Sequence, residues 1–325
     1  MKYSPPLDGL RALAAALVLL FHARVPGLGG GFLGVDIFFV LSGFLITRLL
    51  VTEHESHGAI NYAQFTIRRF RRLYPALLFF LAGYLLVAPF FFTDIHFLKH
   101  LKDSVIAGLY MADYINLSGD PMRYLTHAWT LGVEVKFYLL WPLVMAWLMT
   151  LSRQRACLIL ALLFLGATLW RAWNVHYLAD PWDVYDRFDT HISGLLLGAL
   201  IGFANLRLPE KWWIAGAALL IITLCTTAWR SEATAIFGIT AMEISALLLI
   251  CACPSFLGAS ILPWLGRMSY GFYLWHYLVI RVARVYELDW PATLALGATG
   301  GLAGAALSYY TIERVFRTRR ANIPL

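Results

Sequence analysis

The sequence predicts an all-α protein: a polytopic bundle of about ten transmembrane helices with both termini in the cytoplasm. Of its 325 residues, 60% are hydrophobic and 14% are charged, and the mean hydropathy is +0.67. A soluble domain of this size would lack the polar groups to cover its surface. Apolar segments long enough to cross a bilayer recur along the chain, with basic residues between them. These observations indicate an integral membrane protein.

The apolar segments define the expected spans. They run over residues 8–25, 33–51, 75–93, 128–149, 156–175, 188–204, 211–229, 233–253, 269–286 and 292–312. Ten crossings place both termini on one side of the membrane. No linker between the segments is long enough for a second domain, so we expect residues 1–325 to form a single integral-membrane domain with no appended extracytoplasmic domain. Residues 105–115 are apolar but short, and we expect a re-entrant or interfacial helix there.

Basic residues orient the bundle. Most of the 26 lysines and arginines fall on the side that carries both termini: Lys2, Arg11, Arg48, Arg68, Arg69, Arg71, Arg72, Arg153, Arg155, Arg207, Lys211, Arg267, Arg314, Arg317, Arg319 and Arg320. Cytoplasmic loops carry an excess of lysine and arginine, so we expect that side to face the cytoplasm. The net charge of +7 suits a membrane surface or a phosphorylated ligand. A nucleic acid is not expected as a partner, because no basic face of soluble structure is available to bind it.

The first segment, LDGLRALAAALVLLFHARV, carries two polar residues on one face. Arg11 and His22 bracket a run of apolar residues. Eleven residues at about 100° each bring the two side chains to within roughly 20° of one another, about 16 Å apart along the helix. An arginine and a histidine on one side of an apolar helix are costly in lipid, which favours an interior position. Snorkelling of both side chains at the interface is the alternative.

The second segment begins with a glycine-rich turn, PGLGGGFLGVD. Gly29, Gly31 and Gly34 match a dinucleotide-binding fingerprint in spelling, but no strand precedes them. We expect them to allow a tight external turn and close helix packing. Asp36 then enters the span, where an ionisable group needs a partner. His22, across the short loop, is the expected partner, and an interfacial aspartate in water is the alternative.

Four arginines precede the third segment in FTIRRFRRLYP. Arg68, Arg69, Arg71 and Arg72 come just before Pro75, which we expect to open the span. Guanidinium groups suit phosphate oxygens, so the cluster fits a phosphate clamp. Membrane topology and contact with anionic lipid explain the same residues without a ligand.

Further ionisable residues occur in later segments. His127 and Glu134 are seven residues apart in THAWTLGVEVKFYLLWP and share a helical face within about 20°. A carboxylate at the depth of Glu134 is either a buried ion-pair partner or part of an active site. Arg187 and His191 lie together at the start of the sixth segment, and His276 lies in the ninth. Ionisable residues on several helices indicate a polar interior. A transporter or flippase of a glycan or glycolipid would use such an interior equally well.

Together these motifs resemble acyltransferase family 3, the bacterial integral-membrane acyltransferases that modify cell-surface glycans. The resemblance covers almost the whole chain. It is carried, in order, by LDGLRALAAALVLLFH, GGFLGVDIFFVLSGFLIT, FTIRRFRRLYP, HAWTLGVEVKFYLLWP, LGRMSYGFYLWH and SYYTIE. The last motif ends at Glu313. Members of the family commonly have a proline soon after this glutamate, whereas this chain has Arg314 before Val315.

The resemblance implies about ten transmembrane helices and O-acylation of a carbohydrate with a cytoplasmic acyl-CoA donor, often acetyl-CoA. It also implies that Arg11 and His22 matter for activity, with the arginine cluster and Glu134 as further family positions. We therefore expect a multi-pass acyl-CoA-dependent O-acyltransferase of the bacterial cytoplasmic (inner) membrane, in contact with lipid. Its acceptor is expected to be a cell-surface or exported glycan.

Roles for individual residues follow from the motifs and the resemblance. The expected catalytic residues are His22, Glu134 and Asp36; the expected donor-binding residues are Arg11, Arg68, Arg69, Arg71 and Arg72; and the expected substrate-binding residues are His127, Arg187 and His276. Glu134 is expected to orient His22 or the acceptor. The roughly 16 Å between Arg11 and His22 is of the order of an extended pantetheine arm.

Two routes remain open for His22. Its imidazole takes the proton of the acceptor hydroxyl as the hydroxyl attacks the thioester, or it carries the acyl group itself. The sequence contains neither an HExxH nor a GxSxG motif, so no metal is expected.

Overall fold

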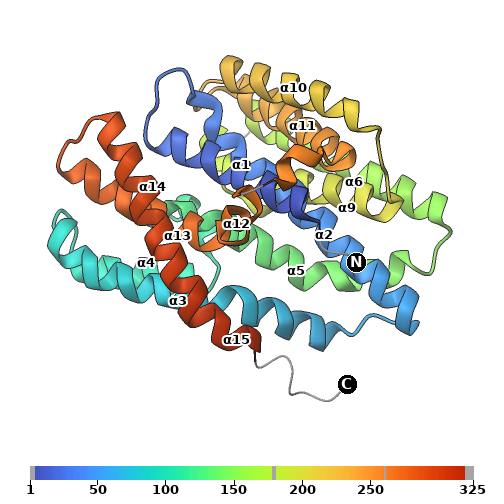
Figure 1. Ribbon diagram of the computed structural model, residues 1–325, viewed down its shortest axis with the longest axis horizontal. Coiled ribbons are helices and arrows are strands. Elements are labelled where there is room, and N and C mark those ends of the chain that lie inside the picture. The colour runs from blue at the N-terminus through green and yellow to red at the C-terminus, as the bar shows by residue number, and fades with distance from the viewer. Residues whose placement is uncertain (1–3, 178–180, 260, 319–325) are drawn as a thin grey trace.

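Helices joined by short loops make up this protein (Figure 1). The structure is a computed structural model that describes residues 4–177, 181–259 and 261–318, and within these ranges it contains no strand. The prediction of an all-α helical bundle is therefore confirmed. Three of the basic residues used to orient the bundle, Lys2, Arg319 and Arg320, lie outside the described residues.

Every predicted span contains a helix. These helices are α1 (Pro5–His22), α2 (Gly34–His57), α3 (Tyr62–Phe91), α5 (Trp129–Leu148), α6 (Arg153–Tyr177), α9 (Ser193–Ala204), α10 (Trp213–Thr226), α11 (Ile239–Ala252), α13 (Ser269–Val285) and α14 (Trp290–Leu307). The shorter helices are α4 (Phe97–Gly108), α7 (Pro181–Tyr185), α8 (Phe188–His191), α12 (Leu262–Arg267) and α15 (Arg314–Thr318). Within the described ranges, six helical segments, those of α1, α2, α3, α5, α6 and α11, are long and apolar enough to cross a membrane. Ten crossings and the side of the termini stay predictions.

The first two helices pack against each other through glycine. A Cβ on Gly31 would come within 2.5 Å of the Leu17 carbonyl oxygen, and one on Gly34 within 2.6 Å of the Ala14 carbonyl oxygen. The expected close packing is therefore confirmed at these two positions. On the other side of α2, a Cβ on Gly198 of α9 would come within 2.0 Å of the Val40 carbonyl oxygen. Small residues of this kind let helix backbones approach closely.

The arginine cluster lies inside a helix, which corrects the prediction that Pro75 opens the third span. α3 begins at Tyr62, where the Asn61 side chain accepts a hydrogen bond from the Gln64 amide and caps the helix. Pro75 lies within α3 and lacks one helical N–H without ending the helix. The cluster consequently has helical spacing, with Arg68 and Arg72 one turn apart on the same face.

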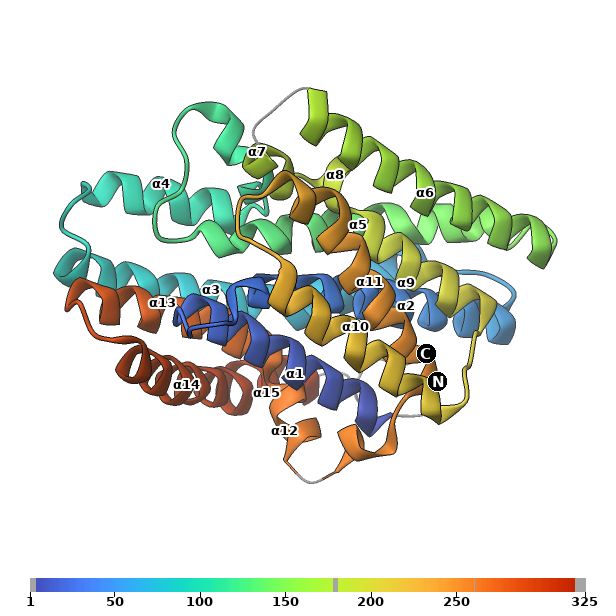
Figure 2. The same ribbon diagram turned by 90° about the horizontal axis from the view of Figure 1, so that it is seen from above.

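Residues 105–115, where a re-entrant or interfacial helix is expected, are divided between two elements. Residues 105–108 belong to α4, which ends at Gly108 and lies along α3 (Figures 1 and 2). Tyr110 then takes a left-handed conformation with φ of 58°, and residues 112–118 form a 3₁₀ turn. The break comes where the chain must reverse to reach α5.

Two hydrophobic cores hold the bundle together. The larger is formed mainly by α1, α2, α5, α9 and α11, and the smaller by α3, α4 and α13. Figure 2 shows α1 and α2 near the middle of the bundle, with α14 and α12 at one edge and α6 at the other. A cavity lies where helices of both cores meet, between α1, α2, α3, α5 and α13.

Candidate functional site

Two adjoining cavities open beside the first half of α1. The first, which we call the arginine cavity, has a volume of about 420 Å³. Its lining residues are Asp8, Arg11, Leu49, Phe65, Arg68, Arg69, Arg71, Arg72, Arg267 and Phe316. The structure therefore brings all the predicted donor-binding residues to one place and adds Arg267, which the sequence did not single out. Asp8 is the one carboxylate among these residues, so the cavity carries a strong excess of positive charge.

Some of these arginines are held by neighbours in the protein. Arg11 forms an ion pair with Asp8 at 3.4 Å. Arg68 lies 3.6 Å from a carboxylate oxygen of Glu53. The guanidinium group of Arg69 lies over the Phe65 ring at 5.6 Å from its centroid. Arg11 lines both cavities, which favours the interior position expected from the sequence.

The second cavity, the inner cavity, has a volume of about 320 Å³. It shares Asp8, Arg11, Leu49, Arg69 and Arg72 with the arginine cavity. Its wall is mostly apolar, formed by side chains such as Phe38, Phe39, Leu45, Ile46 and Leu131. A long ligand with an anionic end and a less polar arm would fit the two cavities in sequence.

Glu134 lies in the wall of the inner cavity. Its carboxylate accepts a hydrogen bond from Ser42 at 2.5 Å, and Tyr138 donates to the same Ser42 hydroxyl at 3.2 Å. The expected contact of Glu134 with His22 is not formed in the described structure. His127, predicted on the same helical face, lies before α5 in a separate 3₁₀ turn, Thr126–Ala128. The prediction that His127 and Glu134 share a face assumed a continuous α-helix between them, and the 3₁₀ turn breaks that continuity.

Three histidines gather beyond the inner cavity, at the end of α1. We call His22, His127 and His276 the histidine cluster. Nδ1 of His22 lies 3.0 Å from Nε2 of His276 on α13. The rings of His22 and His127 both lie against Tyr277, with centroid distances of 4.8 and 4.6 Å. His127 is buried, and neither of its ring nitrogens has a hydrogen-bond partner among the described residues.

Tyr273 connects the inner cavity to the histidine cluster. It lines the cavity, and its hydroxyl donates to the carbonyl oxygen of His127 at 2.8 Å. Thr130, also in the lining, donates to the Tyr273 hydroxyl at 3.0 Å. The arginine cavity, the inner cavity and the histidine cluster thus follow one another beside α1.

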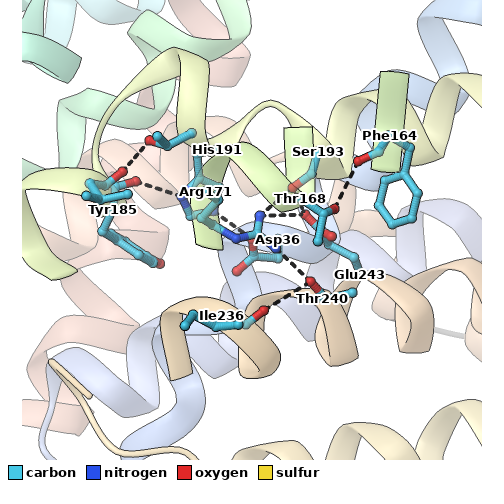
Figure 3. Close-up of polar contacts among 12 residues, drawn as sticks. Asp36, Phe164, Thr168, Arg171, Tyr185, His191, Ser193, Ile236, Thr240 and Glu243 are labelled. Atoms are coloured by element: carbon cyan, nitrogen blue, oxygen red, sulfur yellow. Dashed lines mark hydrogen bonds and ion pairs between the residues drawn. The ribbon is translucent and has the colours of Figure 1, made fainter. Parts of the chain in front are cut away.

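Asp36 has a different partner from the one predicted. It is fully buried, and its Oδ1 lies 2.7 Å from Nε2 of His191, not against His22 (Figure 3). Burial also makes the alternative of a water-exposed aspartate wrong. The reason is geometric: Asp36 lies on the face of α2 toward α8 and α9, whereas His22 at the end of α1 faces α13. Arg187, predicted to bind substrate, pairs with Asp189 and donates to Asn174 at 3.1 Å.

A buried ionic network surrounds Asp36 and His191. Arg171 of α6 donates to Ser193 at 2.5 Å and to Thr240 at 2.6 Å, and it lies 3.6 Å from Glu243 of α11 (Figure 3). Sequence reasoning missed both Arg171 and Glu243. The signal was present, since each is an ionisable residue within an apolar span, as Glu134 is.

No three His, Cys, Asp or Glu side chains in the described part of the chain are arranged to hold a metal ion. The arrangement instead offers positive charge at one place and imidazole nitrogens at another. Such a pair of features can hold an anionic ligand and move a proton or an acyl group at its far end.

Comparisons with known proteins show the family to which this chain is similar. A family model described as an acyltransferase domain matches residues 5–312. Peptidoglycan O-acetyltransferase OatA of Listeria monocytogenes is 33% identical over 97% of this chain and 56% of its own length. The putative peptidoglycan O-acetyltransferase YrhL of Bacillus subtilis is 33% identical over 98% of this chain and 55% of its own. O-acetyltransferase OatA of Staphylococcus aureus is 31% identical over 89% and 52%. The chain spans about half the length of these relatives. No solved structure matches it.

Proposed function

Since this chain belongs to acyltransferase family 3, whose model covers residues 5–312, we propose that it is an acyl-CoA-dependent membrane O-acyltransferase. On this proposal it moves an acetyl group from cytoplasmic acetyl-CoA to a hydroxyl of a bacterial cell-envelope carbohydrate. OatA and YrhL are named as peptidoglycan O-acetyltransferases, so peptidoglycan is the first acceptor to test. The observation that carries the proposal is that α1 has Arg11 in the arginine cavity and His22 in the histidine cluster.

The donor is proposed to occupy both cavities. The phosphates of CoA lie among the arginines, where charge-assisted hydrogen bonds favour them. The pantetheine arm extends through the inner cavity, whose apolar wall carries polar groups at Ser42, Glu134 and Tyr138. These groups suit the amides of the arm. Glu134 on this proposal acts on the donor, because its contact is with Ser42 and not with His22.

His22 is proposed to act at the thioester. In the first route its imidazole takes the proton of the acceptor hydroxyl while that oxygen attacks the acyl carbon, and the CoA thiolate leaves. In the second route an imidazole nitrogen displaces the thiolate, and the acceptor hydroxyl then takes the acyl group from the ring. Both routes need one unprotonated imidazole nitrogen. His127 and His276 lie close enough to serve the same reaction.

Asp36 and Arg187 receive different proposals. We propose that Asp36 stabilises the fold, because it is fully buried against His191 and away from both cavities. Arg187 is partly exposed and is held by Asp189 and Asn174, and we propose that it contacts a substrate at that end of the bundle. Neither residue lines the arginine cavity or the inner cavity.

The experiment uses purified protein in lipid nanodiscs with acetyl-CoA labelled in the acetyl group. Release of CoA and transfer of label to peptidoglycan fragments are measured together. His22→Ala should lower transfer by at least roughly 10²–10⁴-fold, the contribution typical of a general base. His176→Ala is the matched control, because His176 is exposed on α6 and pairs with Glu232 far from both cavities.

Two results would contradict the proposal. One is transfer at the parental rate by a folded His22→Ala variant. The other is movement of a glycan or glycolipid across the membrane by the parent protein without any release of CoA, which would indicate a transporter or flippase.

A further inference from the structure

The contacts of His276 determine which of its ring nitrogens carries hydrogen. Its Nδ1 lies 2.9 Å from the carbonyl oxygen of Phe272, one turn earlier in α13. A carbonyl oxygen only accepts hydrogen bonds, so Nδ1 of His276 is the protonated nitrogen. The ring is 1% exposed and has no carboxylate partner among the described residues, and a charged imidazole would be costly there. His276 is therefore neutral, and its Nε2 is an acceptor.

The contact with His276 also determines which ring nitrogen of His22 carries hydrogen. Nε2 of His276 lies 3.0 Å from Nδ1 of His22, so one of the two nitrogens must donate. Because Nε2 of His276 is the acceptor, Nδ1 of His22 carries the hydrogen. We propose that His276 is a positioning residue, which holds His22 as the Nδ1–H tautomer and leaves Nε2 of His22 as the atom that receives the proton or the acyl group. The catalytic part of this inference rests on the proposed function.

The surroundings of both rings support the assignment. His22 is half-buried, and its Nε2 has no hydrogen-bond partner among the described residues, so this atom is available to a substrate. The end of α1 is held in place because Arg284 donates to the carbonyl oxygen of His22. A ring held at its Nδ1 and at its backbone presents one nitrogen in one direction.

The position of His276 is itself fixed by packing. Its ring stacks on Phe272 with centroids 5.4 Å apart and an angle of 11° between the planes. Behind it, α14 approaches so closely that a Cβ on Gly301 would come within 2.9 Å of the Cα and Cβ of His276. The histidine therefore has little freedom to turn its Nε2 away from His22.

The arrangement has a catalytic consequence in both routes. As Nε2 of His22 gains a proton or an acyl group, the ring becomes positively charged, and the hydrogen bond from its Nδ1 to His276 becomes charge-assisted. Loss of that hydrogen bond should lower kcat by roughly 10- to 100-fold. The KM for acetyl-CoA should change little, because His276 lines neither cavity.

The test measures the tautomer directly. The protein is labelled with ¹⁵N in its histidine rings and placed in nanodiscs without donor or acceptor. Among the nine histidines, the signals of His22 are identified by their loss in His22→Phe. ¹⁵N shifts then report which nitrogen is protonated in the parent, in His276→Phe, which removes the acceptor, and in His276→Gln, whose amide oxygen can replace it. His176→Phe is the matched control.

We expect Nδ1–H at His22 in the parent and in His176→Phe, and a shift toward Nε2–H in His276→Phe. The rate of acetyl transfer should fall in His276→Phe, where the Nδ1–H tautomer of His22 is lost, and should recover in part in His276→Gln. A parent protein with Nε2–H at His22, or a tautomer unchanged in His276→Phe, would overturn the inference. The tautomer is measured without substrate, so full transfer by His22→Phe would instead overturn the proposed function.

Discussion

Arg69 and Arg72 lie at the junction of the two cavities, whereas Arg68 and Arg71 line only the arginine cavity. On the proposed function, an arginine at the junction would contact both the phosphates of the donor and the start of its arm. Loss of such a residue should therefore affect donor binding more than loss of an arginine at the rim. Topology alone would make the four arginines equivalent.

This difference gives a prediction for Arg72→Ala. Acetyl-CoA should bind roughly tenfold or more weakly, since a charge-assisted hydrogen bond to phosphate contributes about 1.5–3 kcal/mol. Acetyl-pantetheine, which lacks the nucleotide phosphates, should lose less. Equilibrium binding to the purified variant measures both affinities.

The matched control for Arg72→Ala is Arg155→Ala. Arg155 is exposed at the start of α6 and lines neither cavity. Single alanine variants of Arg68, Arg69, Arg71 and Arg72 that all bind acetyl-CoA with parental affinity would contradict a role in donor binding. The cluster would then serve only to set the membrane topology.

At the scale of the elements, buried charges connect helices that are distant in sequence. Arg171 of α6 and Glu243 of α11 pair across the network of Figure 3, and Ser193 of α9 bonds to both. A buried pair of this kind adds little net stability, but breaking it leaves an uncompensated charge. The network therefore favours the one packing of α6, α9 and α11 in which these polar groups meet.

Arg171→Leu should destabilise the protein by about 3–5 kcal/mol, because it leaves Glu243 buried without its cation. The double variant Arg171→Leu/Glu243→Leu should recover much of this loss. Thermal unfolding in detergent, followed by helical circular dichroism, measures the effect. His176→Leu breaks an exposed pair on the same helix and should change stability by less than about 1 kcal/mol. An unchanged melting temperature in Arg171→Leu would show that the network does not hold these helices.

At the scale of the whole molecule, the two ends of the bundle differ in character. α1 begins beside the arginine cavity and ends in the histidine cluster, and α2 returns toward the arginines. On the proposed function, a donor that enters at the arginine end would meet its acceptor at the histidine cluster.

The predicted orientation can be tested with single cysteines. In a variant without the four native cysteines, His57→Cys at the exposed end of α2 should react with an impermeant maleimide only after the cells are permeabilised. Tyr286→Cys, exposed after α13, should react in intact spheroplasts. The opposite labelling pattern would show that the bundle has the inverse orientation, with the arginine cavity facing away from the cytoplasm.

The sequence by itself determined the properties that depend on neighbours along the chain. Hydropathy was sufficient to locate a helix in each apolar segment, because a chain in lipid must satisfy its backbone hydrogen bonds internally. Helical geometry was sufficient to separate Arg11 from His22 by three turns on one side of α1. The sequence prediction was wrong at Pro75, because the cap at Asn61 starts α3 earlier in the chain. It was also wrong at His127, because a 3₁₀ turn interrupts the α-helical register that was assumed between His127 and Glu134.

Only the tertiary structure decided which ionisable groups meet. Asp36 was expected beside His22 and lies against His191. Glu134 was expected to orient His22 or the acceptor, and within the protein its carboxylate contacts Ser42. His22 pairs with His276, more than 250 residues away. Such partners depend on the rotation and neighbours of every helix, which close packing of the whole bundle sets. Hydropathy and helical spacing describe one helix at a time, so they indicated a polar interior without showing which groups touch.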